Sequence, residues 1–150
     1  MPEWLTSLTD WERVFTHLRD LVLAYLFAIP IAWDREARER TAGLRTFPLV
    51  ALASCAYALL GFSILDSTDA EARVVQGLIT GIGFIGGGAI LKRGGDVKGT
   101  ATATSLWATG AIGLAVASQR YEIAIIIGAV TLFTLRLLKP LMEASPPGGQ

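Results

Sequence analysis

The feature that most constrains this chain is an uncharged run of eighteen residues, Val74–Leu91, that contains six glycines. In a water-soluble helix each of those glycines would cost roughly 1 kcal/mol relative to alanine. In a lipid bilayer no water competes for the backbone hydrogen bonds, so an isolated crossing segment is helical. Small residues there let a neighbouring helix approach closely. The run therefore predicts a membrane helix that is packed on more than one face and lies at the centre of a bundle.

Two pairs of glycines in this run are spaced four residues apart and lie on different sides of the predicted helix. The stretch GIGFIG within the run also matches a dinucleotide-binding fingerprint, but that motif requires a strand before it and an acidic residue about twenty positions on. No such unit follows here, so we assign the glycines to helix packing. The predicted packing residues are Gly77, Gly81, Gly83, Gly86, Gly87 and Trp107.

Apolar runs predict five membrane crossings. About 20 helical residues are needed to cross the hydrocarbon layer, and four runs approach that length, whereas the first, Leu18–Trp33, is shorter. Asp34–Ala37 is therefore expected at or slightly within the membrane boundary. The four longer runs are Phe47–Leu65, Val74–Leu91, Thr100–Ser118 and Ile123–Leu138. The predicted fold is an all-α polytopic membrane domain over residues 18–139, with the glycine-rich helix at its centre.

The two ends of the chain are predicted to lie outside this domain. Aromatic and leucine residues at helical spacing predict an amphipathic segment over residues 1–17 that lies at the membrane surface. The alternative is that it forms the first turns of the first crossing helix. The tail 140–150, which includes SPPGGQ, is expected to be disordered. Two capping boxes are predicted to open helices, TDWE at Thr9–Glu12 and TDAE at Thr68–Glu71.

The charges exclude several functions and suggest an orientation. Thirteen basic residues balance thirteen acidic ones, so nothing indicates a nucleic-acid partner. Five crossings place nine of the basic residues on one side, which predicts that side as cytoplasmic, with the N-terminus outside and the C-terminus inside. His17 is the only histidine and Cys55 the only cysteine. We therefore expect no enzymatic activity, no cofactor and no metal site built from histidine or cysteine.

Two groups of polar residues are candidates for function. Asp34 and Arg45 are the acid and the base nearest the membrane on the first cytoplasmic hairpin, so an ion pair between them is favourable in a medium of low dielectric constant. Such a pair would fix the hairpin, or Asp34 would bind a cation or a partner's basic group. Arg73 and Gln76 form a polar stripe with Gly77 and Thr80. That stripe would line a pathway or bridge neighbouring helices.

Four ordered motifs resemble those of the MgtC/SapB family of bacterial inner-membrane proteins. They are AWDRE, AGLRTFPLVAL, RVVQGLITGIGFIGGGAIL and VKGTATATSLWATGAIGLA. Matched to the family pattern, they point to Asp34, Arg35, Glu36, Arg45, Thr46, Arg73, Gln76, Gly81, Gly83, Gly86, Thr102 and Trp107. The chain departs from that pattern in having Asp34 in place of glutamate, Phe47 in place of histidine, and Thr100 and Ala101 in place of Leu-Thr.

The resemblance implies a role in adaptation to low magnesium and, in pathogens, in survival inside host cells. It suggests a small modulator of other membrane machinery, with the F-type ATP synthase as a proposed partner, and a short form without the soluble C-terminal domain of longer members. From the residues we expect a homodimer or other homo-oligomer formed through the small-residue faces. The alternative is a transporter or channel subunit that moves Mg²⁺ or H⁺ through an oligomeric bundle.

Overall fold

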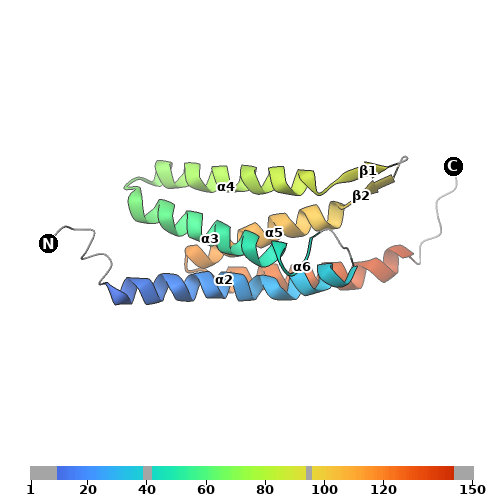
Figure 1. Ribbon diagram of the computed structural model, residues 1–150, viewed down its shortest axis with the longest axis horizontal. Coiled ribbons are helices and arrows are strands. Elements are labelled where there is room, and N and C mark those ends of the chain that lie inside the picture. Colours follow the sequence, from blue (N-terminus) through green and yellow to red (C-terminus); the bar gives the residue numbers. More distant parts are fainter. Residues whose placement is uncertain (1–9, 39–41, 94–95, 144–150) are drawn as a thin grey trace.

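The computed structural model describes residues 10–38, 42–93 and 96–143. Within them the chain forms five helices and one two-stranded hairpin, so the all-α class is confirmed apart from that hairpin. The helices lie roughly along one long axis (Figure 1). Their bounds are α2 Trp11–Arg38, α3 Thr46–Ile64, α4 Thr68–Gly88, α5 Thr100–Ala117 and α6 Tyr121–Glu143, and the strands are β1 Leu91–Arg93 and β2 Asp96–Lys98.

Helix α2 starts earlier and ends later than the sequence predicts. The side chain of Asp10 caps it by accepting a hydrogen bond from the backbone N–H of Arg13 at 3.3 Å. The helix continues through Pro30, and its 28 residues cover about 42 Å. The prediction of a separate surface helix is wrong for residues 11–17, which are the first turns of α2. Residues 1–9, including Thr9 of the predicted capping box, lie outside the described residues.

Helix α4 ends before the apolar run does. Its cap is Ser67, whose side chain accepts a hydrogen bond from Ala70 N at 3.3 Å, so the capping box predicted at Thr68–Glu71 is wrong by one residue. The helix ends at Gly88 instead of Leu91, because three successive glycines favour the end of a helix. The next residues form β1, which pairs with β2 in an antiparallel hairpin that the sequence analysis did not predict.

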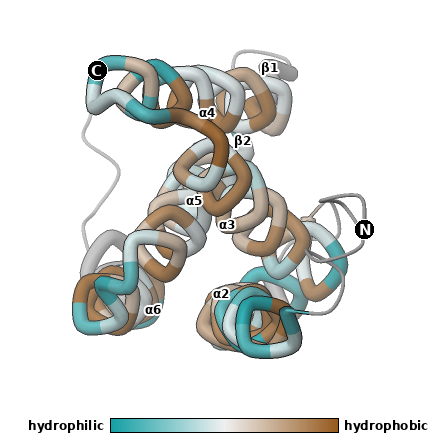
Figure 2. Tube along the Cα trace, turned by 90° about the vertical axis from the view of Figure 1, so that its left-hand side faces the viewer, coloured by the Kyte–Doolittle hydropathy of each residue, from teal (hydrophilic) through white to brown (hydrophobic). Residues whose placement is uncertain are grey.

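The central helix of the bundle is α5, not α4. Helix α5 packs against α3, α6, α4 and α2, whereas α4 packs mainly against α5. The end-on view shows α4 at one edge, α3 and α5 in the middle, and α2 and α6 at the opposite edge (Figure 2). A Cβ atom on Gly113 of α5 would collide with the backbone oxygen of Ala51 in α3. The prediction of a central glycine-rich α4 is therefore wrong, because close packing uses the small residues of α5.

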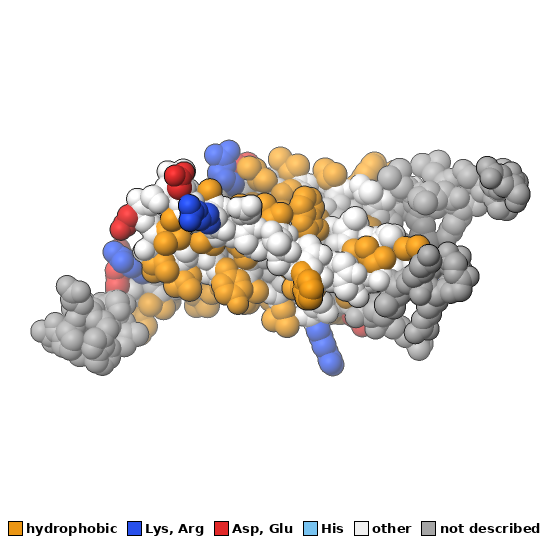
Figure 3. Space-filling view, turned by 90° about the horizontal axis from the view of Figure 1, so that it is seen from above, with side chains coloured by type: hydrophobic (Ala, Val, Ile, Leu, Met, Phe, Trp, Pro, Cys, Tyr) orange, Lys and Arg blue, Asp and Glu red, His pale blue; other side chains and the backbone are white. Residues whose placement is uncertain are grey.

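The outside of the bundle suits a lipid environment. In the described part of the chain, three helices are long and apolar enough to cross a membrane, over Trp11–Ala37, Thr46–Ile64 and Thr100–Ala117. Hydrophobic side chains spread over the face that includes α4, and most of the charged side chains coloured on this face lie toward the left of the view (Figure 3). Crossing by α4 and α6, which have 21 and 23 residues, stays a prediction.

The connection between α5 and α6 is the tight turn that the sequence predicts. Gln119 adopts a left-handed conformation with φ of 57°, and Arg120 N donates to Ala115 O at 2.8 Å. Helix α6 then continues to Glu143, so residues 140–143 are helical, although the sequence analysis assigns them to a disordered tail. Residues 144–150 lie outside the described residues.

Candidate functional site

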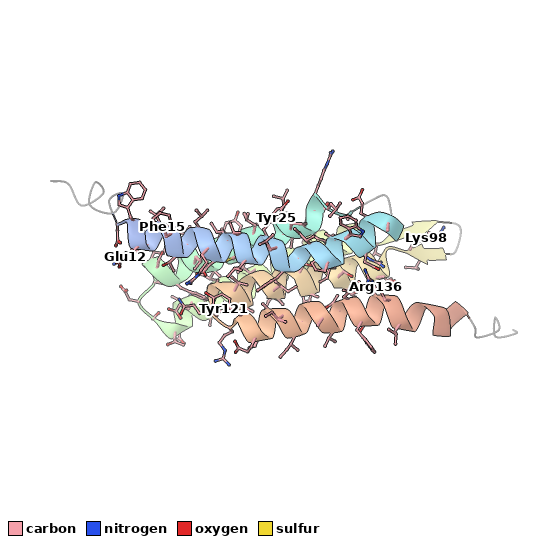
Figure 4. The ribbon with its side chains drawn as sticks, turned by 90° about the horizontal axis from the view of Figure 1, so that it is seen from below. Glu12, Phe15, Tyr25, Lys98, Tyr121 and Arg136 are labelled. Atoms are coloured by element: carbon pink, nitrogen blue, oxygen red, sulfur yellow. The ribbon has the colours of Figure 1, made fainter. Side chains whose placement is uncertain are left out.

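The candidate site is a buried carboxylate at the C-terminal end of α2. Asp34 is only 4% exposed. Its Oδ2 atom accepts a hydrogen bond from Arg35 Nη2 at 3.0 Å, and its Oδ1 atom accepts one from Arg136 Nε at 3.3 Å. Figure 4 shows Arg136, which belongs to α6, in the space between α6 and α2. The site therefore ties two helices together across 102 positions in sequence.

These partners differ from the one that the sequence analysis suggests. Arg45 stands at the N-terminus of α3, is exposed, and lines a groove between α3 and α4. The position expected for it beside Asp34 is taken by Arg35, which is itself 4% exposed, and by Arg136. A signal for Arg136 was present in the sequence, because it is the one charged residue of the apolar run Ile123–Leu138. A charge inside such a run needs a partner within the bundle.

Glu36 holds the hairpin that leads into α3. Its Oε2 atom accepts a hydrogen bond from Leu44 N at 3.0 Å. A Cβ atom on Gly43 would collide with the Glu36 carboxylate, so the close approach requires glycine at that position. The carbonyl oxygen of Gly43 in turn accepts hydrogen bonds from Thr46 N and Phe47 N, at 3.0 and 3.1 Å. This contact explains the AGLRT segment as the turn that positions α3.

The other polar residues predicted for function do not gather around Asp34. Arg73 and Gln76 are exposed on α4, which begins at the end of the bundle opposite to the C-terminal end of α2, and Asp34 belongs to that end of α2 (Figure 1). Thr102 is fully buried on α5. The hydroxyl groups of Ser105 and Thr109 on the same helix donate to the backbone oxygens one turn earlier, at 2.6 and 2.8 Å. These two hydroxyls therefore form their hydrogen bonds within their own helix.

The glycines of α4 divide into two kinds. A Cβ atom on Gly86 would lie 3.2 Å from Ala103 O, so this glycine sets the contact with α5. Five others have no atom within 4 Å of the equivalent position. They are Gly77, Gly81, Gly83, Gly87 and Gly88. Trp107 is half-exposed and lines, with Gly83, Gly86 and Gly87, a shallow hollow of about 320 Å³.

A second buried carboxylate, missed by the sequence analysis, lies near the other end of α2. Asp20 is 1% exposed, and its Oδ1 atom accepts hydrogen bonds from Tyr121 Oη at 2.8 Å and from Arg19 Nε at 3.0 Å. Arg19 Nη2 also donates to the hydroxyl of Tyr121 at 2.8 Å. Asp20 and Asp34 therefore both join α2 to α6, about 21 Å apart along the helix. The adjacent Arg19 suggested a helix boundary, which hid this pairing.

The start of α6 carries an exposed ion pair ahead of the predicted crossing. Arg120 Nε donates to Glu122 Oε1 at 2.6 Å. A hydrogen bond from its own backbone, and then this bond to Arg120, lower the pKa of Glu122 below its usual value. Among the described residues, no group of three or more His, Cys, Asp or Glu side chains is arranged to hold a metal ion.

Comparison with known proteins identifies the relatives of this chain. The MgtC family matches residues 21–144. The putative magnesium transporter YhiD of Escherichia coli K12 is 34% identical over 128 residues, which cover 81% of this chain and 60% of that protein. Protein MgtC of Brucella abortus is 32% identical over 133 residues, 89% of this chain and 56% of that protein. Protein MgtC of Salmonella typhimurium LT2 is 32% identical over 126 residues, which cover 84% of this chain and 54% of that protein. No solved structure matches significantly.

The fold and the charged cluster define a small helical membrane protein whose α2 and α6 are joined by buried carboxylates. The chain belongs to the MgtC family. It spans somewhat more than half the length of the curated relatives that it matches.

Proposed function

We propose that this protein is a non-enzymatic modulator in the bacterial inner membrane that acts by direct helix contact on a membrane partner. The observation that carries the proposal is the open glycine face of the edge helix α4. Lipid tails are as apolar as leucine, so exposed hydrophobic side chains need no partner in a bilayer. A strip of exposed glycines, in contrast, lets another helix backbone approach closely and gain dispersion contacts and weak hydrogen bonds.

The process that we propose is magnesium homeostasis, and in particular adaptation to low magnesium, with a role in virulence where the bacterium is a pathogen. The names of the relatives support the link, since one is called a putative magnesium transporter and others are called MgtC. The partner would be a second copy of the chain or a larger membrane complex. The family resemblance suggests the F-type ATP synthase as that complex.

The proposed arrangement has five crossings, with the N-terminus outside and the C-terminus in the cytoplasm. The lengths of α4 and α6 and the asymmetry of basic residues support it. Reporter fusions at the two ends test the orientation. A cytoplasmic reporter should be active at the C-terminus and inactive at the N-terminus, and the opposite result would reverse the assignment.

A double variant, Gly83→Leu with Gly87→Leu, tests the contact surface on the side of α4 that does not line the groove between α3 and α4. Both positions have open space in this chain, so the variant should insert and fold. We expect it to migrate as a smaller species in native gels of solubilised membranes, because leucine would hold the partner's backbone away. In a strain that lacks the native gene, it should fail to support growth at low magnesium.

The matched control is Ala129→Leu, which places leucine on an exposed position of α6. It should retain the larger species and the growth. If the double variant at equal membrane abundance retains both as well, the α4 face is not the contact surface and the proposal is overturned.

A second candidate function is cation movement. Its supporting observation is that Asp20 and Asp34 are both buried within one candidate membrane span, Trp11–Ala37. Buried ionisable residues in a membrane commonly mark ion or proton pathways. The name of the YhiD relative points in the same direction.

Flux of Mg²⁺ and H⁺ into liposomes distinguishes the two candidates. Under the leading proposal, correctly inserted wild-type protein produces no flux above that of empty liposomes. Flux that is present in the wild type and lost in Asp34→Asn, at equal reconstitution, would replace the modulator by a transporter or channel subunit.

A further inference from the structure

A tapering groove separates α3 from α4. The two helices are joined by a short turn and move apart toward their other ends (Figure 1). Near the turn they touch, since a Cβ atom on Gly61 would lie 3.0 Å from the side chain of Val74. Further along α4, Gly77 and Gly81 have nothing within 4 Å. The resulting groove has a volume of about 960 Å³ and is lined almost wholly by apolar groups.

The groove has a cationic group at its wide end only. Arg45 and Thr46, at the start of α3, line that end, whereas Ile64, Leu65 and Val74 line the narrow one. Neither the cap nor the first turn of α3 carries an acidic residue, and the nearby Glu36 carboxylate is engaged by Leu44 N just before the cap. The wide end therefore favours an anion beside an apolar channel.

The anion would be held by side chains and not by free backbone donors. Thr46 N and Phe47 N already donate to Gly43 O, and Pro48 has no N–H group. The guanidinium of Arg45 and the hydroxyl of Thr46 are the donors available at this end. Arginine is well suited to phosphate because its planar donors match two phosphate oxygens.

We propose that this groove binds an anionic glycerophospholipid, with its acyl chains between α3 and α4 and its phosphate group at Arg45. The taper supports a lipid over a transmembrane helix, because the groove narrows toward the contact between Gly61 and Val74, where a helix about 10 Å across cannot enter. The groove volume of about 960 Å³ falls in the range of about 300–1,000 Å³ that is typical of ligand sites.

Selection for an anionic headgroup follows from the surroundings. Acyl chains of every lipid are equally apolar, so the groove wall alone cannot distinguish one phospholipid from another. Arg45 is the charged residue that lines the groove, so it supplies the preference. The inference goes beyond the proposed function and does not rest on it. The lipid would lie on the side of α4 where Gly77 and Gly81 line the groove, and it leaves Gly83 and Gly87, which line the hollow beside Trp107, open to a partner.

Native mass spectrometry of the purified, delipidated protein tests the proposal. Phosphatidylglycerol and phosphatidylcholine with identical acyl chains are titrated in parallel. We expect phosphatidylglycerol to bind more tightly, and Arg45→Gln to weaken it about fivefold, the effect of one basic residue near an anionic headgroup. Gly77→Leu fills the groove and should weaken binding of both lipids.

Two matched variants control for charge and for size. Arg73→Gln removes an exposed arginine of α4 outside the groove, and Gly83→Leu fills open space that does not line it. Both should bind as the wild type does. If Gly77→Leu fails to fold, Arg45→Gln against Arg73→Gln still decides the headgroup preference.

Three results would overturn the proposal. Equal affinity for the two lipids would remove the headgroup selection. An unchanged affinity in Arg45→Gln would move the phosphate elsewhere. A dimer that carries no lipid, and that Gly77→Leu dissociates, would show that a second copy of the chain occupies the groove.

Discussion

Helices α4 and α5 are both rich in small residues, yet the bundle uses them in opposite ways. In α5, Gly113 lies against the backbone of α3 and Gly110 lies against Ile82 of α4. A neighbouring helix therefore occupies the space that a side chain would otherwise take. In α4, Gly83 and its open neighbours face space that no other part of the described chain fills. The comparison teaches that a small residue marks a close approach only where a second element is present to make it. The following predictions test that difference, from the largest expected effect to the smallest.

The largest effect is expected where a buried charge holds the helices around α5. Asp34→Ala takes a carboxylate away from the buried guanidinium of Arg35 and from Arg136. We expect a loss of about 3 kcal/mol in stability, as for other broken buried ion pairs. Thermal unfolding of the purified protein in detergent measures it. Arg73→Ala, which removes an exposed charge from α4, is the control and should change stability little. Equal losses in the two variants would contradict the division between the packed and the open side.

The next effect contrasts two glycines directly. Gly113→Ala adds a Cβ atom that collides with Ala51 O, so overpacking should cost about 1–3 kcal/mol. Gly83→Ala adds the same atom to open space and should leave the unfolding temperature unchanged or slightly higher. The measurement is the unfolding temperature of both variants in the same detergent. A neutral Gly113→Ala would mean that α5 is not held as tightly as its contacts indicate.

A smaller effect is expected for Gly86, the glycine of α4 that behaves like those of α5. A Cβ atom there would lie 3.2 Å from Ala103 O, which requires a shift of a few tenths of an ångström. We expect Gly86→Ala to cost about 1 kcal/mol, between the values for Gly83→Ala and Gly113→Ala. Denaturation of the three variants in one series gives the order. A result outside that interval would show that the space around the added Cβ atom does not determine the loss of stability.

The smallest effect concerns the turn that connects α5 to α6. The lowered pKa of Glu122 means that its ionised form is favoured in the folded state. Its contribution to stability is therefore present above the ordinary glutamate pKa and is lost as the pH falls through the lowered value. Glu122→Gln should unfold at a slightly lower temperature than the wild type at neutral pH, and the two curves should converge in acid. A difference that persists in acid would assign the effect to something other than this carboxylate.

Part of the fold could be predicted from local sequence. Apolar runs predicted five helices, and the short segment around Arg120 predicted the tight turn between the last two. The β1–β2 hairpin was missed because three residues in each strand give too little pattern to distinguish a strand from a loop. The start of α2 was placed too late because Arg19 and Asp20 suggested a membrane boundary, although Tyr121 satisfies Asp20 within the fold.

The candidate site was predicted less completely. Asp34 was identified from its position at the end of an apolar run, and the structure places it in a buried ion pair. Its partner could not be chosen, because several arginines lie near the same predicted boundary and sequence distance does not rank them. Arg136 was identifiable as an unusual charge in an apolar run, but only the packing of α6 on α2 brings it to Asp34.

By itself, the sequence determined that this is a helical membrane protein of the MgtC family, because hydropathy and motif order are properties of neighbouring residues along the chain. Only the tertiary structure decided that α5 is central, that α4 exposes its glycines, and that Asp34 pairs with Arg136. Those features depend on contacts between segments as far as 102 positions apart. Such contacts are selected by how whole helix surfaces fit together, and no local pattern contains that information.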